Sequence, residues 1–138
     1  MPRFDSLKVL NTFGAVALVL LVGYLVLSQT GLPGEADVDG LPDGGFKRTL
    51  LDSPTPVLVD FYADWCGPCR AMSPILDDFA GRNPSVRVVR VNVDQSGDIA
   101  RHFNIQSIPT LMVFKNGKLT ARRSGVVNQD ALKQMVSK

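Results

Sequence analysis

Residues 57–69 read VLVDFYADWCGPC, an apolar run that leads into two cysteines with C-x-x-C spacing. The apolar run, residues 56–62, is typical of a central β-strand buried on both faces. Beyond it, residues 69–80 place apolar side chains on one helical stripe, which predicts an α-helix ending with Gly81 at its C-cap. The cysteines therefore follow a buried strand and stand at the start of a helix.

This placement gives the cysteine pair its chemistry. The start of a helix offers unpaired backbone N–H groups and the positive end of the helix dipole, which favour a thiolate on Cys66. Pro68 lies in the first turn, where its missing N–H costs no hydrogen bond. Cys69 is one turn further on and can attack a sulfur bound to Cys66, as two-step disulfide exchange requires. The alternative is a structural disulfide or a pair of inert thiols.

Composition excludes two other classes of site. Cys66 and Cys69 are the only cysteines and His102 is the only histidine, so the chain lacks four Cys or His ligands for a tetrahedral zinc site. We therefore expect no metal. The net charge of +2 is small and both signs are interleaved along the chain, so we expect no nucleic-acid partner.

The remaining elements are predicted from periodicity and turn signals. They are a helix over residues 46–51, a buried strand over 86–93, a short helix over 97–103, strands over 110–114 and 118–123, and a helix N-capped by Asn128. Asn116-Gly117 between extended runs indicates a tight hairpin. Strand–helix–strand units joined to a hairpin predict an α/β fold with a central mixed β-sheet flanked by helices.

The N-terminal segment has a different character. Residues 9–34 contain no charge, and residues 9–28 are long enough as one helix to cross a lipid bilayer. We expect them to be a transmembrane signal anchor that follows a short, basic cytoplasmic region, residues 1–8. The basic end stays in the cytoplasm, so the C-terminal domain faces the outside, which in a bacterial inner membrane is the periplasm. The alternative is a secreted protein whose signal peptide is cleaved near Ser28.

The connection to the domain is rich in Gly, Pro and Asp. Residues 29–45 are predicted to be a linker, and residues 36–41 within it are an alternative short first strand. The folded domain is predicted over residues 46–138, about enough chain for one modest core.

The segment VDFYADWCGPCR, residues 59–70, resembles thioredoxin, and the similarity extends over roughly residues 46–138. Further family marks follow in order: Pro74, residues 92–94, 108–110 and 114–117, and Gly125. The resemblance implies the thioredoxin fold and an enzyme that exchanges protein disulfides without a bound cofactor. The spacer Gly67-Pro68 resembles that of reducing members, which implies a protein-disulfide reductase; the alternative is an oxidant or isomerase.

The resemblance also implies roles for single residues. Cys66 is similar to the attacking nucleophile and Cys69 to the buried resolving thiol. Asp60 matches the family's buried carboxylate beneath Cys69. Its place inside an apolar run predicts burial, a raised pKa and a role as base toward Cys69, and the alternative is an exposed carboxylate at a sheet edge. Pro109 matches the family's cis-proline opposite the dithiol.

An apolar docking surface for extended protein segments is implied around Cys66. It comprises Gly67, Pro68, Ile108, Pro109, Gly125 and Val126. We expect Trp65 to act as a substrate platform, with packing in the protein as the alternative. We expect Arg122 and Arg123 to be solvent-exposed charges at the end of a strand, with no role in the site.

Arg90 departs from the family, which often has lysine there. As a permanent cation near Asp60 it would oppose the rise of that pKa; the alternative is that Arg90 points to solvent.

A reductant outside the cytoplasm also needs electrons from across the membrane, and residues 1–8 are too short to deliver them. We therefore expect a transmembrane electron donor as a partner, besides protein thiols and disulfides as substrates. A tethered binding module with an incidental C-x-x-C is the remaining alternative.

Overall fold

A computed structural model describes residues 16–22 and 41–138. The chain divides into two units, Met1–Glu35 and Ala36–Lys138, and each is described by itself. In the first unit, residues 16–22 are helical. None of the helices within the described ranges has both the length and the apolar character needed to span a membrane. Most of the predicted anchor (residues 9–28), the predicted cytoplasmic region and Ser28 lie outside the described residues.

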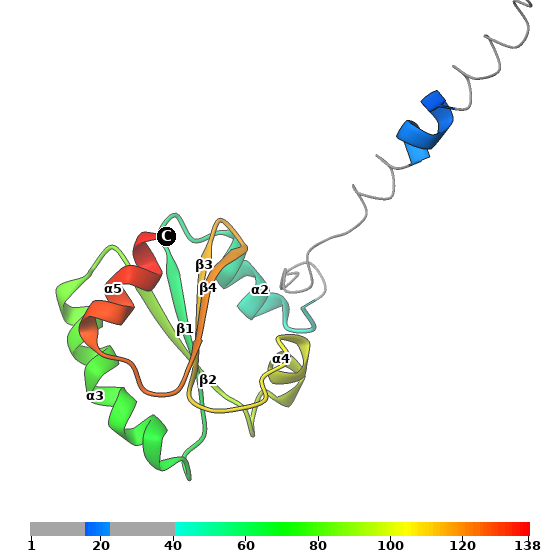
Figure 1. Cartoon of the computed structure of the whole chain (residues 1–138). Coiled ribbons are helices and arrows are strands. Elements are labelled where there is room, and N and C mark those ends of the chain that lie inside the picture. Colours follow the sequence, from blue (N-terminus) through cyan, green and yellow to red (C-terminus); the bar gives the residue numbers. More distant parts are fainter. Residues whose placement is uncertain (1–15, 23–40) are drawn as a thin grey trace, which may run out of the picture. The chain divides into compact units, whose positions relative to one another are not determined.

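The second unit contains a four-stranded mixed sheet, as predicted (Figure 1). In chain order, its elements are α2 (Gly44–Leu51), β1 (Val57–Tyr62), α3 (Gly67–Arg82), β2 (Arg87–Asn92), α4 (Gly97–His102), β3 (Thr110–Lys115), β4 (Lys118–Ser124) and α5 (Gln129–Ser137). The strand order is β2-β1-β3-β4. β1 runs parallel to β2, whereas the β1–β3 and β3–β4 pairs are antiparallel.

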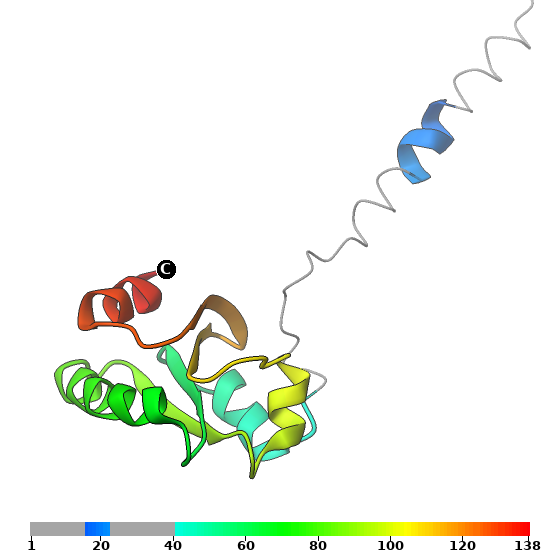
Figure 2. The same cartoon turned by 60° about the horizontal axis from the view of Figure 1, so that its bottom comes forward.

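Helices cover both faces of the sheet. Figure 2 shows α2 and α4 on one side and α3 and α5 on the other. Each face has its own core cluster of side chains. The α2/α4 cluster includes Phe46, Leu50, Val59, Phe61, Ile99, Phe103, Met112 and Phe114. The α3/α5 cluster includes Leu58, Met72, Leu76, Phe79, Leu111, Val113, Leu132 and Met135.

The central strand β1 places one carboxylate in this core. Its residues 57–61 are all buried, as the continuous apolar run predicts. Side chains alternate between the two faces of a strand. Asp60 therefore faces the same side as Leu58, which belongs to the α3/α5 cluster. The Asp60 side chain is thus directed toward the helix that carries the cysteines.

Local signals fix several element ends. The Asn128 side chain accepts a hydrogen bond of 2.9 Å from Ala131 N and caps α5, as predicted. At the hairpin between β3 and β4, Asn116 and Gly117 have φ values of 51° and 75°. Both residues have the positive φ that a two-residue hairpin of this type requires, so the predicted turn is confirmed.

The domain begins earlier than residue 46. The Asp43 side chain accepts hydrogen bonds from Gly45 N and Phe46 N, and this cap starts α2 at Gly44. Leu41 is also buried against the α2/α4 core. The last residues of the predicted linker thus belong to the domain. The alternative first strand, apart from Leu41, lies outside the described residues.

Two other expectations need correction. α3 extends to Arg82 with Asn83 as its C-cap, so Gly81 lies inside the helix. The Asn83 side chain donates a hydrogen bond to Phe79 O at 2.8 Å, which satisfies a carbonyl of the last turn. β2 is only partly buried, because it is an outer strand of the sheet formed by the described residues.

Candidate functional site

The cysteine pair forms a disulfide at the start of α3, with sulfur atoms 2.11 Å apart. Cys66 is the N-cap residue of α3, and its Sγ accepts a hydrogen bond from Cys69 N at 3.2 Å. Pro68 lies in the first turn, as predicted. The N–H of Cys69 and the helix dipole therefore both point at Cys66 Sγ, which favours negative charge on that sulfur once the disulfide is opened.

A second chain segment faces the disulfide. The carbonyl oxygen of Ile108 lies 3.9 Å from Cys66 Sγ, and the Ile108–Pro109 peptide bond is cis. Gly125 N donates a hydrogen bond to Pro109 O at 2.8 Å. The structure thus brings Ile108, which is far from the cysteines in sequence, beside Cys66, and joins Gly125 to the neighbouring Pro109.

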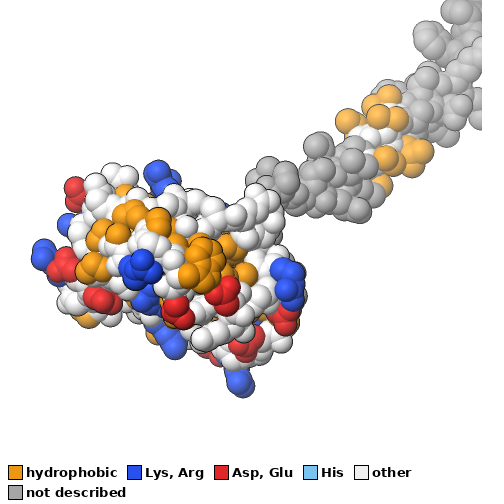
Figure 3. Space-filling model, turned by 90° about the horizontal axis from the view of Figure 1, so that it is seen from below, with side chains coloured by type: hydrophobic (Ala, Val, Ile, Leu, Met, Phe, Trp, Pro, Cys, Tyr) orange, Lys and Arg blue, Asp and Glu red, His pale blue; other side chains and the backbone are white. Residues whose placement is uncertain are grey.

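Apolar side chains at this end of the domain are open to solvent. Trp65 is 69% exposed and Val126 is 47% exposed, so Trp65 does not pack into the core. Trp65 Nε1 donates a hydrogen bond to Asp94 Oδ2 at 2.9 Å, which orients the ring. Gly67 and Pro68 are also exposed. Figure 3 views the domain from the end where β1 leads into α3 and shows hydrophobic side chains with charged groups around them.

Asp60 is fully buried and paired with Arg90. Arg90 Nε donates a hydrogen bond to Asp60 Oδ2 at 3.0 Å, while Oδ1 is buried and has no hydrogen-bond partner within the described residues. Burial raises the pKa of Asp60 above its ordinary value, and the hydrogen bond and charge of Arg90 partly offset that rise. Of the two alternatives for Arg90, the structure shows the pairing with Asp60.

Two residues that the sequence did not single out hold Arg90 in place. Arg90 Nη1 donates a hydrogen bond of 2.7 Å to Ser73 Oγ, and its Cζ lies 4.2 Å from the centre of the Tyr62 ring. Ser73 lies four residues after Cys69, about one helical turn, and no sequence signal links it to Arg90. The guanidinium is therefore held by β1, β2 and α3 together.

Several of these groups line a pocket of about 200 Å³ that reaches Cys69. It is lined by Tyr62, Ala63, Asp64, Cys69, Arg70, Ser73 and Arg90. Cys69 is 1% exposed, so it meets the pocket only through a small part of its surface. Cys69 and Arg90, the partner of Asp60, therefore line the same pocket.

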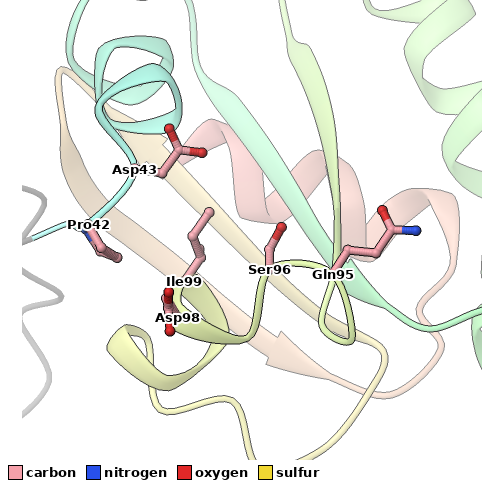
Figure 4. Close-up of a pocket in the computed structure, with 6 residues that line it drawn as sticks. All are labelled: Pro42, Asp43, Gln95, Ser96, Asp98 and Ile99. Atoms are coloured by element: carbon pink, nitrogen blue, oxygen red, sulfur yellow. The ribbon is translucent and has the colours of Figure 1, made fainter.

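A second pocket, of about 190 Å³, lies between the starts of α2 and α4 (Figure 4). It is lined by Pro42, Asp43, Gln95, Ser96, Asp98 and Ile99. None of these is a predicted site residue, and the Asp43 carboxylate already caps α2. Among the residues that the structure describes, no group of three or more His, Cys, Asp or Glu side chains is arranged to hold a metal ion.

Comparisons with known proteins agree with this geometry. The thioredoxin family model matches residues 37–138. The chain is 42% identical over 104 residues to the chloroplastic M-type thioredoxin of Chlamydomonas reinhardtii, covering 75% of this chain and 74% of that protein. It is 44% identical over 97 residues to thioredoxin 1 of a Nostoc species, covering 70% of this chain and 91% of that protein.

Solved structures show the same likeness. Oxidised mitochondrial thioredoxin 3 from Saccharomyces cerevisiae is similar with a TM-score of 0.61 and 35% identity, covering 67% of this chain and 87% of that one. Fasciola hepatica thioredoxin is similar with a TM-score of 0.63 and 31% identity, covering 70% and 94%. With a C-x-x-C disulfide capping the helix that follows the central strand, the chain belongs to the thioredoxin family of thiol–disulfide oxidoreductases.

Proposed function

We propose that the protein is a membrane-tethered reductase of protein disulfides, with its thioredoxin domain outside the cytoplasm. The observation that carries the reductase chemistry is the position of Cys66 Sγ. It caps α3, accepts the Cys69 N–H and lies beside the Ile108 carbonyl at the end of the domain where Trp65 and Val126 are exposed. A substrate segment docked there would meet the sulfur that the helix favours as a thiolate.

The first step is attack by the Cys66 thiolate of the reduced enzyme on one sulfur of a substrate disulfide. A Cys66–substrate sulfur bond forms, the substrate S–S bond breaks, and the other substrate sulfur leaves as a thiolate that takes a proton from water. The exposed ring of Trp65 and the backbone of Ile108 are proposed to hold the substrate strand during this attack.

The second step is resolution by Cys69. Its thiol gives a proton to Asp60, and the resulting thiolate attacks Cys66 Sγ and displaces the second substrate thiolate. The Cys66–Cys69 disulfide of the structure forms, so two electrons have passed from the enzyme dithiol to the substrate. Asp60 Oδ1 is the oxygen proposed to take the proton, because Oδ2 is occupied by Arg90.

The direction of exchange rests on the spacer Gly67-Pro68, which resembles that of reducing family members. Working as a reductant outside the cytoplasm requires a supply of two electrons for each cycle. We propose that a separate transmembrane dithiol reductase restores the Cys66–Cys69 dithiol.

The proposed tether is residues 9–28. The stretch of residues 9–34 contains no charge, and the basic residues Arg3 and Lys8 precede it. A helix of that length matches the bilayer, and the basic end favours the cytoplasmic side. The alternative of cleavage near Ser28 would leave the same domain outside but untethered.

The test is the redox state of the cysteine pair in growing cells that express the full chain. Alkylation with a mass-shifting maleimide reports the reduced fraction, and fractionation with protease treatment of spheroplasts reports location and sidedness. We expect membrane-bound, protease-accessible protein with a substantial reduced fraction that falls when the membrane's dithiol reductases are deleted. A pair that is fully oxidised whatever reductase is present would contradict the reducing role. Cys66→Ser is the matched control, since it cannot support exchange.

A further inference from the structure

Two side chains on one face of β4 form hydrogen bonds near the two ends of the segment that contains the cis-proline Pro109. Arg122 and Ser124 are two residues apart on this strand, so their side chains lie on the same face. Arg122 Nη1 donates a hydrogen bond to Phe103 O at 3.0 Å, and Nη2 donates to Asn104 O at 2.9 Å. Arg122 is thus more than the solvated strand end expected from the sequence.

These two carbonyls belong to the end of α4. Phe103 is the C-cap residue and Asn104 has a φ of 48°, so the chain leaves the helix there. Carbonyls at a helix C-terminus lack intrahelical partners, and a cation is favoured near them. The planar fork of an arginine can bond both carbonyls at once, which lysine cannot reproduce. Arg122 therefore fixes the point where the loop of residues 104–109 begins.

The other end of this loop is also bonded to β4. Thr110 Oγ1 donates to Ser107 O at 2.7 Å and lies 2.9 Å from Ser124 Oγ. With its hydrogen used on Ser107, the Thr110 hydroxyl accepts from Ser124. Arg122 thus bonds one end of the loop that carries Ile108 and Pro109 directly, and Ser124, on the same face of β4, supports the other end through Thr110.

We propose that Arg122 is a positioning residue for substrate docking: it holds the loop of residues 104–109 so that the Ile108 carbonyl stays beside Cys66. The inference rests on the proposed docking of protein substrates at Ile108. It distinguishes two kinds of substrate. A protein disulfide needs the backbone of Ile108 for docking, whereas a small disulfide needs only the sulfur of Cys66. Loosening the loop should therefore impair the reduction of protein disulfides selectively.

Arg123 provides a matched control. It has the same charge and strand, but it points to the opposite face of β4. We would compare Arg122→Met, Arg122→Lys and Arg123→Met in the full chain. The readouts are KM and kcat for insulin reduction with dithiothreitol as the electron source, the rate of reaction with dithiobis(nitrobenzoic acid), and thermal unfolding.

We expect Arg122→Met to raise KM for insulin about five- to tenfold, less than the full loss of one hydrogen bond from a charged donor, because the freed loop still visits its docking position. Its reaction with the small disulfide should stay within about twofold of wild type. Arg122→Lys should recover part of the loss, and Arg123→Met should match wild type. Ser124→Ala, which removes the hydrogen bond that orients the Thr110 hydroxyl toward Ser107 O, should show a selective effect of the same kind and serves if Arg122→Met does not fold.

Three results would overturn the inference: an unchanged KM for insulin in both Arg122→Met and Ser124→Ala, a parallel loss with both disulfides, or an equal loss in Arg123→Met. A wild-type chain that does not reduce insulin at all would instead contradict the proposed function. The two failures are therefore distinguishable.

Discussion

Arg90 and Asp60 are Cα partners across the parallel strands β1 and β2, and Arg90 Nε donates a hydrogen bond to Asp60 Oδ2 at 3.0 Å. The buried carboxylate of Asp60 is thus paired with a cation that cannot lose its proton. One oxygen is occupied and the other has no partner within the described residues. The pKa of Asp60, the base proposed for Cys69, therefore depends on two opposing effects: burial raises it and Arg90 lowers it.

Removing the Arg90 guanidinium should raise the pKa of Asp60 further. Burial alone would then act on the carboxyl, because the hydrogen bond and the charge that lower the pKa are both lost. Carboxyl-carbon NMR titration of Arg90→Met against wild type measures the shift. Arg90→Lys tests the charge alone, and Arg87→Met is the control for a cation lost elsewhere on β2. An Asp60 pKa that is the same in Arg90→Met and wild type would refute this account of the pair.

Asp60 should make stability depend on pH in a defined direction. Its pKa is raised on folding, so the folded state keeps the proton to higher pH than the unfolded chain does. The free energy of unfolding therefore falls as pH rises from the ordinary carboxyl pKa through the folded one, and the loss is complete above the folded pKa. Asp60→Asn removes this loss.

Relative to wild type, Asp60→Asn should accordingly be more stable at about pH 8 than it is near pH 4. Urea unfolding at both pH values measures this. The exposed Asp77→Asn should show no such pH-dependent gain. A gain for Asp60→Asn that is larger at the acidic pH would have the wrong sign.

The sequence was sufficient to predict the helices and strands of the domain, because the apolar run of β1, the Asn116-Gly117 turn and the Asn128 cap are local signals. The burial of Asp60 followed from its apolar neighbours. The apolar pattern puts the start of α2 too late, because the first apolar residue of the helix, Phe46, comes three positions after the Asp43 cap. β2 was expected to be more buried, since its valines do not reveal that it is an outer strand of the described sheet.

The site was predicted less completely, because its long-range contacts depend on register and rotamer. The pairing of Arg90 with Asp60 requires the exact parallel register of β1 and β2, and both orientations of Arg90 were compatible with the sequence. The hydrogen bonds that Arg90 donates to Ser73 and that Arg122 donates to the end of α4 join residues 17 to 19 positions apart. No local pattern encodes such contacts.

Cys69→Ser should trap the first step of exchange. Cys66 can still attack a substrate disulfide, but no thiol remains to release it, so a Cys66–substrate disulfide should accumulate and multiple turnover should be lost. Non-reducing electrophoresis and intact-mass analysis detect the adduct. Cys66→Ser should form none. If Cys69→Ser accumulates no adduct while Cys66→Ser does, the roles of the two sulfurs are reversed.

Trp65→Ala should weaken substrate binding without unfolding the domain. The ring is 69% exposed and makes one hydrogen bond, to Asp94, so the free energy of unfolding should change by only about 0.5 kcal/mol. KM for insulin should rise about threefold or more, because exposed aromatic side chains contribute strongly to docking. Asp94→Asn changes the partner of the hydrogen bond that orients the Trp65 ring but keeps the ring, so it tests the effect of orientation separately from that of contact. A large loss of stability with an unchanged KM would show that Trp65 serves packing instead.

The most direct test of the central claim is the equilibrium reduction potential of the Cys66–Cys69 pair in the full chain, measured against glutathione and dithiothreitol buffers. The proposed reductase should have a potential near that known for thioredoxin itself, about −270 mV. A potential above about −180 mV, in the range of isomerases and oxidants, would contradict it.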